Sequence, residues 1–147
     1  MKIFLFFLLF SIHFYAQNNI PSIGDPMPCA VVDSVQWLIT SGQFAKGCYK
    51  TFNNINFFFA TIESNTISFI STTDSNFVTP EGFKVGDCYN KIIPYLKSDI
   101  IYEPGWGYYS KLTSGWYANY NVDEACASHN ILKLKSDSTV FQYFKRN

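Results

Sequence analysis

The sequence predicts an α+β domain, an antiparallel β-sheet with one or two short helices packed on it. Runs of β-branched and aromatic residues, separated by turns rich in glycine, proline and serine, indicate antiparallel strands. Residues 85–99 instead place apolar residues three and four positions apart, as a helix does. The chain is 48% apolar and 19% aromatic, with 11 basic and 11 acidic residues, which excludes a disordered chain. The balanced charge gives no reason to expect a nucleic-acid partner.

Residues 1–16 predict a cleaved signal peptide. Lys2 precedes an apolar run over residues 3–12, and Ala16 stands before a polar stretch. The run is shorter than the ~20 residues that span a bilayer, and an uncleaved anchor is the alternative. We therefore expect an exported protein, periplasmic or secreted, whose mature chain has no membrane span. An extended leader over residues 17–28 should precede a single domain over residues 29–147.

The four cysteines all follow the expected signal. An even number of cysteines in an exported chain predicts disulfides, and three pairings are possible. We favour Cys29–Cys48 together with Cys88–Cys126, because each pair then closes one half of the chain. Four buried thiols are the alternative. No cysteine directly follows the apolar run, so we expect no lipid anchor.

The first half of the expected domain reads mainly as strands. Residues 30–41 fit a helix or a strand, and their β-branched and aromatic residues favour a strand over residues 35–40 that turns into residues 43–49. Residues 55–63 and 66–73 predict a hairpin. Because neither face of residues 66–73 is purely polar, we expect this hairpin to lie centrally in the sheet.

The second half begins with the expected helix. Asp87 is a candidate N-cap for an apolar stripe formed by Tyr89, Ile92, Ile93 and Leu96. Pro94 lies inside this stripe and should shorten or kink the helix. Residues 100–121 then predict three strands with tight turns, residues 122–130 a polar loop, and residues 131–136 and 138–145 two final strands.

A short sequence echo joins the two halves. Ile23-Gly24-Asp25 and Val85-Gly86-Asp87 lie 62 residues apart, and each precedes a cysteine-containing segment and a group of β-rich runs. Three matched positions fit either an internal duplication or chance.

Residues 70–92 (ISTTDSNFVTPEGFKVGDCYNKI) and 102–120 (YEPGWGYYSKLTSGWYANY) carry a resemblance to known proteins. They resemble uncharacterised exported bacterial proteins, and the VGD-helix piece is similar to SmpA/OmlA-like outer-membrane assembly lipoproteins and to beta-lactamase-inhibitor-protein-like modules. The resemblance implies a glycine-led turn that starts a helix packed on an antiparallel sheet, and a protein-binding or envelope-associated role. It transfers no catalytic residue. The chain departs from these families in lacking a lipobox and in placing Pro94 within the helix.

Candidate catalytic or metal-binding groups are sparse. Cys126 and His129, near Asp123 and Glu124, make half of a zinc site or simply a solvated loop. Asp99 and Glu103 are a hydrolytic pair only if they lie at the right distance, and otherwise solvated charges. Gly105 and Gly107 are too isolated for a phosphate loop and predict a turn with positive φ. We therefore expect no enzyme, no cofactor and no metal.

Aromatic density over residues 102–120 is the feature that bears on function. Neighbouring residues of a strand point to opposite faces, so some of these rings should face outward unless a second layer covers them. Exposed aromatics mark interaction sites. We expect them to bind another envelope or secreted protein, or alternatively a glycan; a small hydrolase is the remaining alternative. The candidate binding residues are Tyr102, Trp106, Tyr108, Tyr109, Trp116, Tyr117 and Tyr120.

Overall fold

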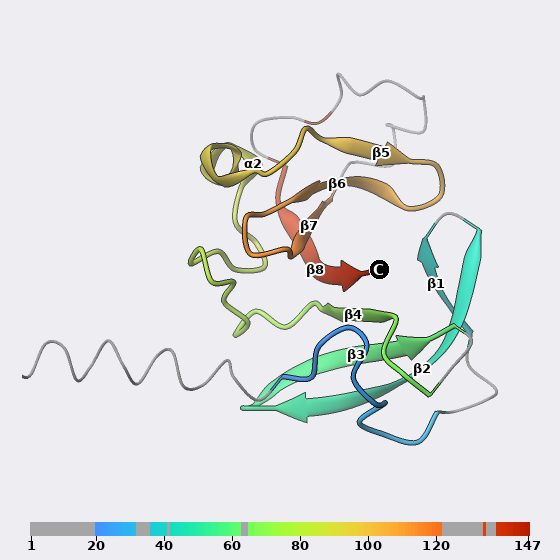
Figure 1. Ribbon diagram of the computed structural model, residues 1–147. Coiled ribbons are helices and arrows are strands. Elements are labelled where there is room, and N and C mark those ends of the chain that lie inside the picture. Colours follow the sequence, from blue (N-terminus) through green and yellow to red (C-terminus); the bar gives the residue numbers. More distant parts are fainter. Residues whose placement is uncertain (1–19, 32–35, 41, 63–64, 122–133, 135–137) are drawn as a thin grey trace, which may run out of the picture.

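The computed structural model describes residues 20–147 except 32–35, 41, 63–64, 122–133 and 135–137. Its strands form one antiparallel sheet in the order β1-β2-β3-β4-β8-β7-β6-β5. The sheet is strongly curved and nearly closed, so that the β1–β2 hairpin rises toward the β5–β6 side (Figure 1). The strands are β1 (Gln36–Thr40), β2 (Gln43–Phe52), β3 (Ile55–Thr61), β4 (Phe69–Thr72), β5 (Ile101–Glu103), β6 (Gly107–Lys111), β7 (Tyr117–Tyr120) and β8 (Val140–Arg146).

The expected α+β architecture is wrong: the described chain is mostly antiparallel β, with no layer of helices on the sheet. Its helical part is one α-turn, α2 (Tyr89–Ile92), followed by the 3₁₀ turn η1 (Ile93–Tyr95). Pro94 lies within η1 and cannot donate a main-chain hydrogen bond, so the helical segment ends after two turns. This shortening agrees with the prediction from the sequence. Loops cover the outer face of the sheet instead. No helix in the described parts of the chain is long and apolar enough to cross a membrane.

Most of the expected strands are confirmed. The strand interpretation of residues 35–40 is correct, and the turn after it contains Gly42 at φ 82°. β2 and β3 are joined at Asn53 and Asn54, both with positive φ, the conformation that a tight hairpin requires. β3 and β4 pair centrally in the sheet, although their connection is longer than the two residues expected. Of the two final strands, β8 is described, and residues 131–136 lie almost wholly outside the described residues.

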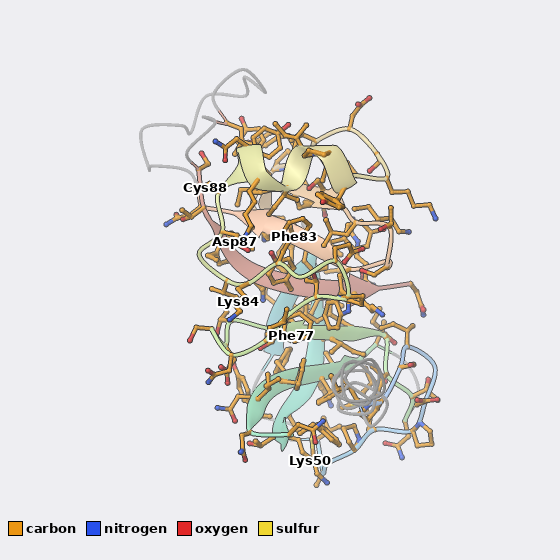
Figure 2. All side chains as sticks on the ribbon, turned by 90° about the vertical axis from the view of Figure 1, so that its left-hand side faces the viewer. Lys50, Phe77, Phe83, Lys84, Asp87 and Cys88 are labelled. Carbon is orange, nitrogen blue, oxygen red and sulfur yellow. A yellow bond between two sulfur atoms is a disulfide. The ribbon has the colours of Figure 1, made fainter. Side chains whose placement is uncertain are left out.

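The two faces of the sheet carry separate apolar clusters. The inner cluster joins residues from β1 at one edge to β6 near the other, so it occupies the concave side. It consists of Ile39, Ala45, Phe58, Ala60, Phe69, Tyr109 and Phe144, with Trp106 and Tyr117 against it. The outer cluster is larger, and the segment over residues 73–88 contributes Phe77 and Phe83 to it (Figure 2).

Glu81 fastens the 73–88 segment to the β6–β7 turn. Its carboxylate accepts hydrogen bonds from the Thr113 hydroxyl at 2.8 Å and from the Ser114 amide and hydroxyl at 2.6 and 2.9 Å. Burial alone raises the pKa of Glu81, but these hydrogen bonds outweigh it and hold the pKa below its usual value. The loop that replaces the expected helix layer is therefore held by a charged contact.

Two turns with the same geometry hold the outer layer in place. In the first, the Gly24 amide donates to the Ile67 carbonyl at 2.8 Å, and the Ile67 amide donates back to the Asp25 carbonyl at 2.8 Å. In the second, Gly86 donates to Val140 at 2.7 Å, and Val140 donates back to Asp87 at 2.9 Å. We call them the Gly-Asp turns. The first turn binds Ile67, two residues before the central strand β4, and the second binds Val140, the first residue of the central strand β8.

The match between the Gly-Asp turns extends to their side chains. The Asp25 carboxylate accepts from the Ser22 amide at 2.7 Å, and the Asp87 carboxylate accepts from the Lys84 amide at 2.8 Å. Asp87 therefore closes its own turn, and its carboxylate also pairs with Lys91 Nζ at 2.8 Å. The prediction that Asp87 is the N-cap of the helix is wrong, since Cys88 holds that position.

The strand order shows the same twofold repetition. A meander of four strands, β1 to β4, meets a second meander, β5 to β8, along the β4–β8 pair. The last strand of each meander has a Gly-Asp turn bound at or just before its first residue. The strand order thus adds a second repeated feature to the sequence echo, and an origin by duplication stays a prediction.

We predict that Gly24→Ala and Gly86→Ala destabilise the protein to a similar extent. Both glycines have strongly positive φ, 92° and 93°, and a Cβ at either would meet nothing within 4 Å, so the cost is conformational. It should be about 1–2 kcal/mol each. Urea denaturation measures it, with Asn90→Ala on the exposed side of α2 as the control. A cost at one turn only would contradict their equivalence.

A disulfide ties the leader to the sheet. Cys29 and Cys48 are bonded, with their Cα atoms 6.1 Å apart, which confirms the first of the two expected pairs. Cys88 is half-buried with a free thiol, in place of the second expected bridge. Its expected partner, Cys126, lies outside the described residues. The leader otherwise reaches the sheet through the first Gly-Asp turn and a hydrogen bond from Lys50 Nζ to the Pro28 carbonyl at 2.8 Å.

We predict that replacing Cys29 and Cys48 by serine lowers the free energy of unfolding by about 3 kcal/mol, because the bridge closes a loop of about 20 residues in the unfolded chain. Thermal denaturation of the wild type with and without reductant should show the same loss. A double variant as stable as the oxidised wild type would show that the bridge does not constrain the unfolded chain.

Candidate ligand-binding cleft

A cleft of about 200 Å³ opens on the inner face of the sheet. It lies over β3, β4 and β8, and the turn between β5 and β6 closes one side. No lining residue is acidic or basic, so the cleft offers apolar rings together with neutral hydroxyl and amide groups. The lining residues are Tyr49, Asn56, Phe58, Phe69, Ser71, Thr72, Thr73, Trp106 and Gln142.

Trp106 reaches the cleft because the β5–β6 turn folds back over the inner face. Gly105 and Gly107 on either side of it have φ of 77° and 110°, which confirms the expected positive-φ turn. The Trp106 amide donates to the Glu103 carbonyl at 2.9 Å and closes the turn. The indole then packs edge-on against Phe69 and Phe144, with centroid distances of 6.0 and 5.7 Å.

Tyr49 supplies the exposed aromatic ring of the cleft. Its side chain is 62% exposed and lies on Phe58, with the ring centroids 5.1 Å apart. Phe58 can lie there because Gly47 has no side chain: a Cβ at Gly47 would overlap the Phe58 ring and the Phe59 carbonyl oxygen. Nothing in the sequence pattern predicts this arrangement, since Gly47 lies inside a strand pattern and Tyr49 lies outside the aromatic-rich segment.

A polar network fills the inner face beyond the cleft. The Tyr109 hydroxyl donates to Glu103 Oε2 at 2.8 Å and accepts from Arg146 Nη2 at 2.6 Å, and Arg146 also pairs with Glu103 at 3.1 Å. The Arg146 guanidinium lies 5.1 Å from the Tyr109 ring centroid. Burial, followed by the hydrogen bond to Glu103, raises the pKa of Tyr109 to about 12. These groups are paired with one another, which points to a structural role.

Two polar atoms of the inner face have no hydrogen-bond partner among the described residues. They are Trp106 Nε1 and Asn119 Oδ1, both buried. Leaving a buried donor or acceptor unpaired costs about 1–3 kcal/mol each. Unpaired buried polar groups of this kind are found more often at functional sites than elsewhere in a protein.

The seven aromatic residues singled out in the sequence do not form one exposed platform. Tyr108, Trp116, Tyr120 and Tyr109 are buried, and Tyr102, Trp106 and Tyr117 are half-buried. They divide between the faces as strand alternation requires: Tyr109, Trp106 and Tyr117 belong to the inner cluster, and the others to the outer cluster. Trp106 is the member that lines the cleft. A binding role for the other six stays a prediction.

The other candidate groups do not assemble with the cleft. Asp99 is exposed, whereas Glu103 is engaged by Tyr109 and Arg146. Asp123, Glu124, Cys126 and His129 lie outside the described residues. Within the described ranges, no group of three or more His, Cys, Asp or Glu residues could hold a metal ion.

Comparisons with known proteins add little beyond this geometry. No family model matches the chain, and no curated protein matches it. A solved structure of the uncharacterized protein yfeY from Escherichia coli is similar with a TM-score of 0.46 and 16% identity, over 69% of this chain and 77% of that one. A likeness at this level carries no functional argument. The resemblance to SmpA/OmlA-like and beta-lactamase-inhibitor-protein-like modules stays a prediction.

We predict that Tyr109→Phe lowers the free energy of unfolding by about 1–2 kcal/mol, because it removes a hydroxyl that both donates and accepts. Tyr95→Phe is the matched control, since Tyr95 is 49% exposed. Chemical denaturation at pH 7 compares them. If Tyr109→Phe and Tyr95→Phe lower the free energy of unfolding equally, the hydrogen bonds of Tyr109 contribute no more to stability than a surface contact does.

The same tyrosine predicts a dependence of stability on alkaline pH. Its pKa is about 12 in the folded state and near 10 when unfolded, so the unfolded chain loses its proton first. The stabilisation is therefore complete below pH 10 and lost as the pH rises toward 12. Tyr120 and Tyr143, whose pKa values burial also raises, act in the same direction. Tyr109→Phe should flatten part of this fall in alkaline denaturation curves, and an unchanged slope would contradict the raised pKa.

Proposed function

We propose that this protein is an exported, non-enzymatic binding module that holds a neutral, hydroxyl-rich ligand, such as one sugar residue of a glycan, in the inner-face cleft. The observation that carries the proposal is the composition of the cleft lining, which combines aromatic rings with neutral hydroxyl and amide side chains. Sugars present apolar ring faces and a periphery of hydroxyl groups, which matches this combination. The Cys29–Cys48 bridge supports export, because disulfides persist in oxidising compartments.

The size of the cleft favours a small ligand. Its volume of about 200 Å³ is below the ~300–1,000 Å³ of pockets that enclose drug-sized molecules. One sugar residue of a longer glycan suits this space. The rest of the glycan would leave through the open side of the cleft, where Tyr49 is exposed. A charged ligand is disfavoured, since no lining side chain would neutralise it.

Binding of an envelope protein through the strand aromatics was the first expectation from the sequence. Most of those rings are buried or half-buried and offer little surface to a partner protein. A small neutral ligand in the cleft is therefore the better-supported function. Catalysis by Asp99 or Glu103 is likewise less well supported, because Glu103 is held by Arg146.

We predict that Tyr49→Ala and Gln142→Ala each weaken glycan binding about tenfold, the equivalent of about 1.4 kcal/mol. Tyr49 offers an exposed ring face and Gln142 an amide, and both line the cleft. A glycan array identifies the ligand, and calorimetry then gives the Kd of each variant. Tyr95→Ala, an exposed tyrosine outside the cleft, should leave the Kd unchanged. An array without hits above background, or equal loss in Tyr95→Ala, would rule the proposal out.

A further inference from the structure

A second cavity of about 200 Å³ lies on the opposite, outer face of the sheet. Leader residues 20–22 form one wall, and Ile70, Phe77 and Trp116 form an apolar floor. The first Gly-Asp turn holds the leader wall against β4, and Figure 2 shows Phe77 on this face. The cavity is thus built from chain segments that are far apart in sequence, and the interactions described above hold them in place.

Lys145 is the charged group of this cavity. It lies on β8 opposite Ile70 of β4, at the seam between the two meanders. Its ammonium is 4.9 Å from the centroid of the Trp116 ring, and its side chain is half-buried. Among the residues that the structure describes, no acceptor makes a hydrogen bond with this ammonium, although it has three donors to satisfy.

The surroundings of Lys145 leave its charge poorly compensated. Burial lowers its pKa, and the field of Glu81 only partly opposes this. The Glu81 carboxylate is already taken by Thr113 and Ser114. A half-buried cation beside apolar rings is costly unless an anion pairs with it.

We propose that the outer cavity binds a small apolar monocarboxylate, whose carboxylate pairs with the Lys145 ammonium and whose hydrocarbon part lies on Trp116, Phe77 and Ile70. One positive charge on an apolar floor complements one negative charge on an apolar body. The nearby negative charge of Glu81 disfavours a dianion such as phosphate. The site is separate from the inner-face cleft and does not depend on the function proposed for it.

Benzoate and its neutral analogue benzyl alcohol test the proposal. Each is titrated into the purified protein and followed by NMR, through the shifts of the Trp116 indole N–H and the Ile70 amide. Benzoate should give saturable shifts, with a Kd at least tenfold lower than that of benzyl alcohol. Inorganic phosphate should bind more weakly than benzoate. Equal binding of benzoate and benzyl alcohol, or no saturable shift with benzoate, would overturn the proposal.

Variants of Lys145 assign the preference to its charge. Lys145→Met should abolish the tenfold discrimination, and Lys145→Arg should retain it, which covers the case in which methionine packs poorly. Lys111→Met is the matched control, since Lys111 also lies over an aromatic ring, that of Tyr117 at 5.1 Å, but on the inner face. Discrimination that survives in Lys145→Met, or that is lost equally in Lys111→Met, would show that Lys145 is not the anion ligand.

Discussion

The fold depends on the paired main-chain hydrogen bonds that join each Gly-Asp turn to a central strand. The first turn binds Ile67, two residues before β4, and the second binds Val140, the first residue of β8. They place the leader and the 73–88 segment over the outer face, where Ile23, Phe77 and Phe83 meet the sheet. Without a helix layer, these loops must keep water from the outer cluster. Loops can do so only when their own polar main-chain groups are satisfied, which is what the turns provide.

The inner face shows how two equivalent halves have come to differ. Gly47, Ala60 and Phe69 form a row across β2, β3 and β4, and Tyr109, Asn119 and Gln142 form the corresponding row across β6, β7 and β8. In the first half the absence of a side chain at Gly47 leaves room for the Phe58 ring, which contacts Tyr49 at a tilted angle. In the second half Tyr109 fills the same position and is locked by Glu103 and Arg146. The cleft lies between the open half and the filled half, with lining residues from both.

Local chemistry was readable from the sequence, and long-range packing was not. Most of the strands, the break at Pro94 and the positive φ at Gly105 and Gly107 follow from residue types and short spacings. The Cys29–Cys48 bridge was the favoured one of three possible pairings. The sequence overestimates the helical content, because the apolar stripe over residues 89–96 indicates packing and does not determine the length of the helix. The cleft could not be inferred, since Tyr49 and Gln142 are 93 positions apart in the numbering and meet only through the curvature of the sheet.

The seam between β4 and β8 also bears on the history of the fold. Each meander has its own Gly-Asp turn and contributes one strand to the seam, an arrangement like that of two subunits in a symmetric homodimer. Fusing two such subunits into one polypeptide removes the requirement that both remain identical. Lys145 on one side of the seam and Thr72 at the matching place on the other show that equivalent positions of the two halves carry different residues, which a strictly symmetric dimer could not do.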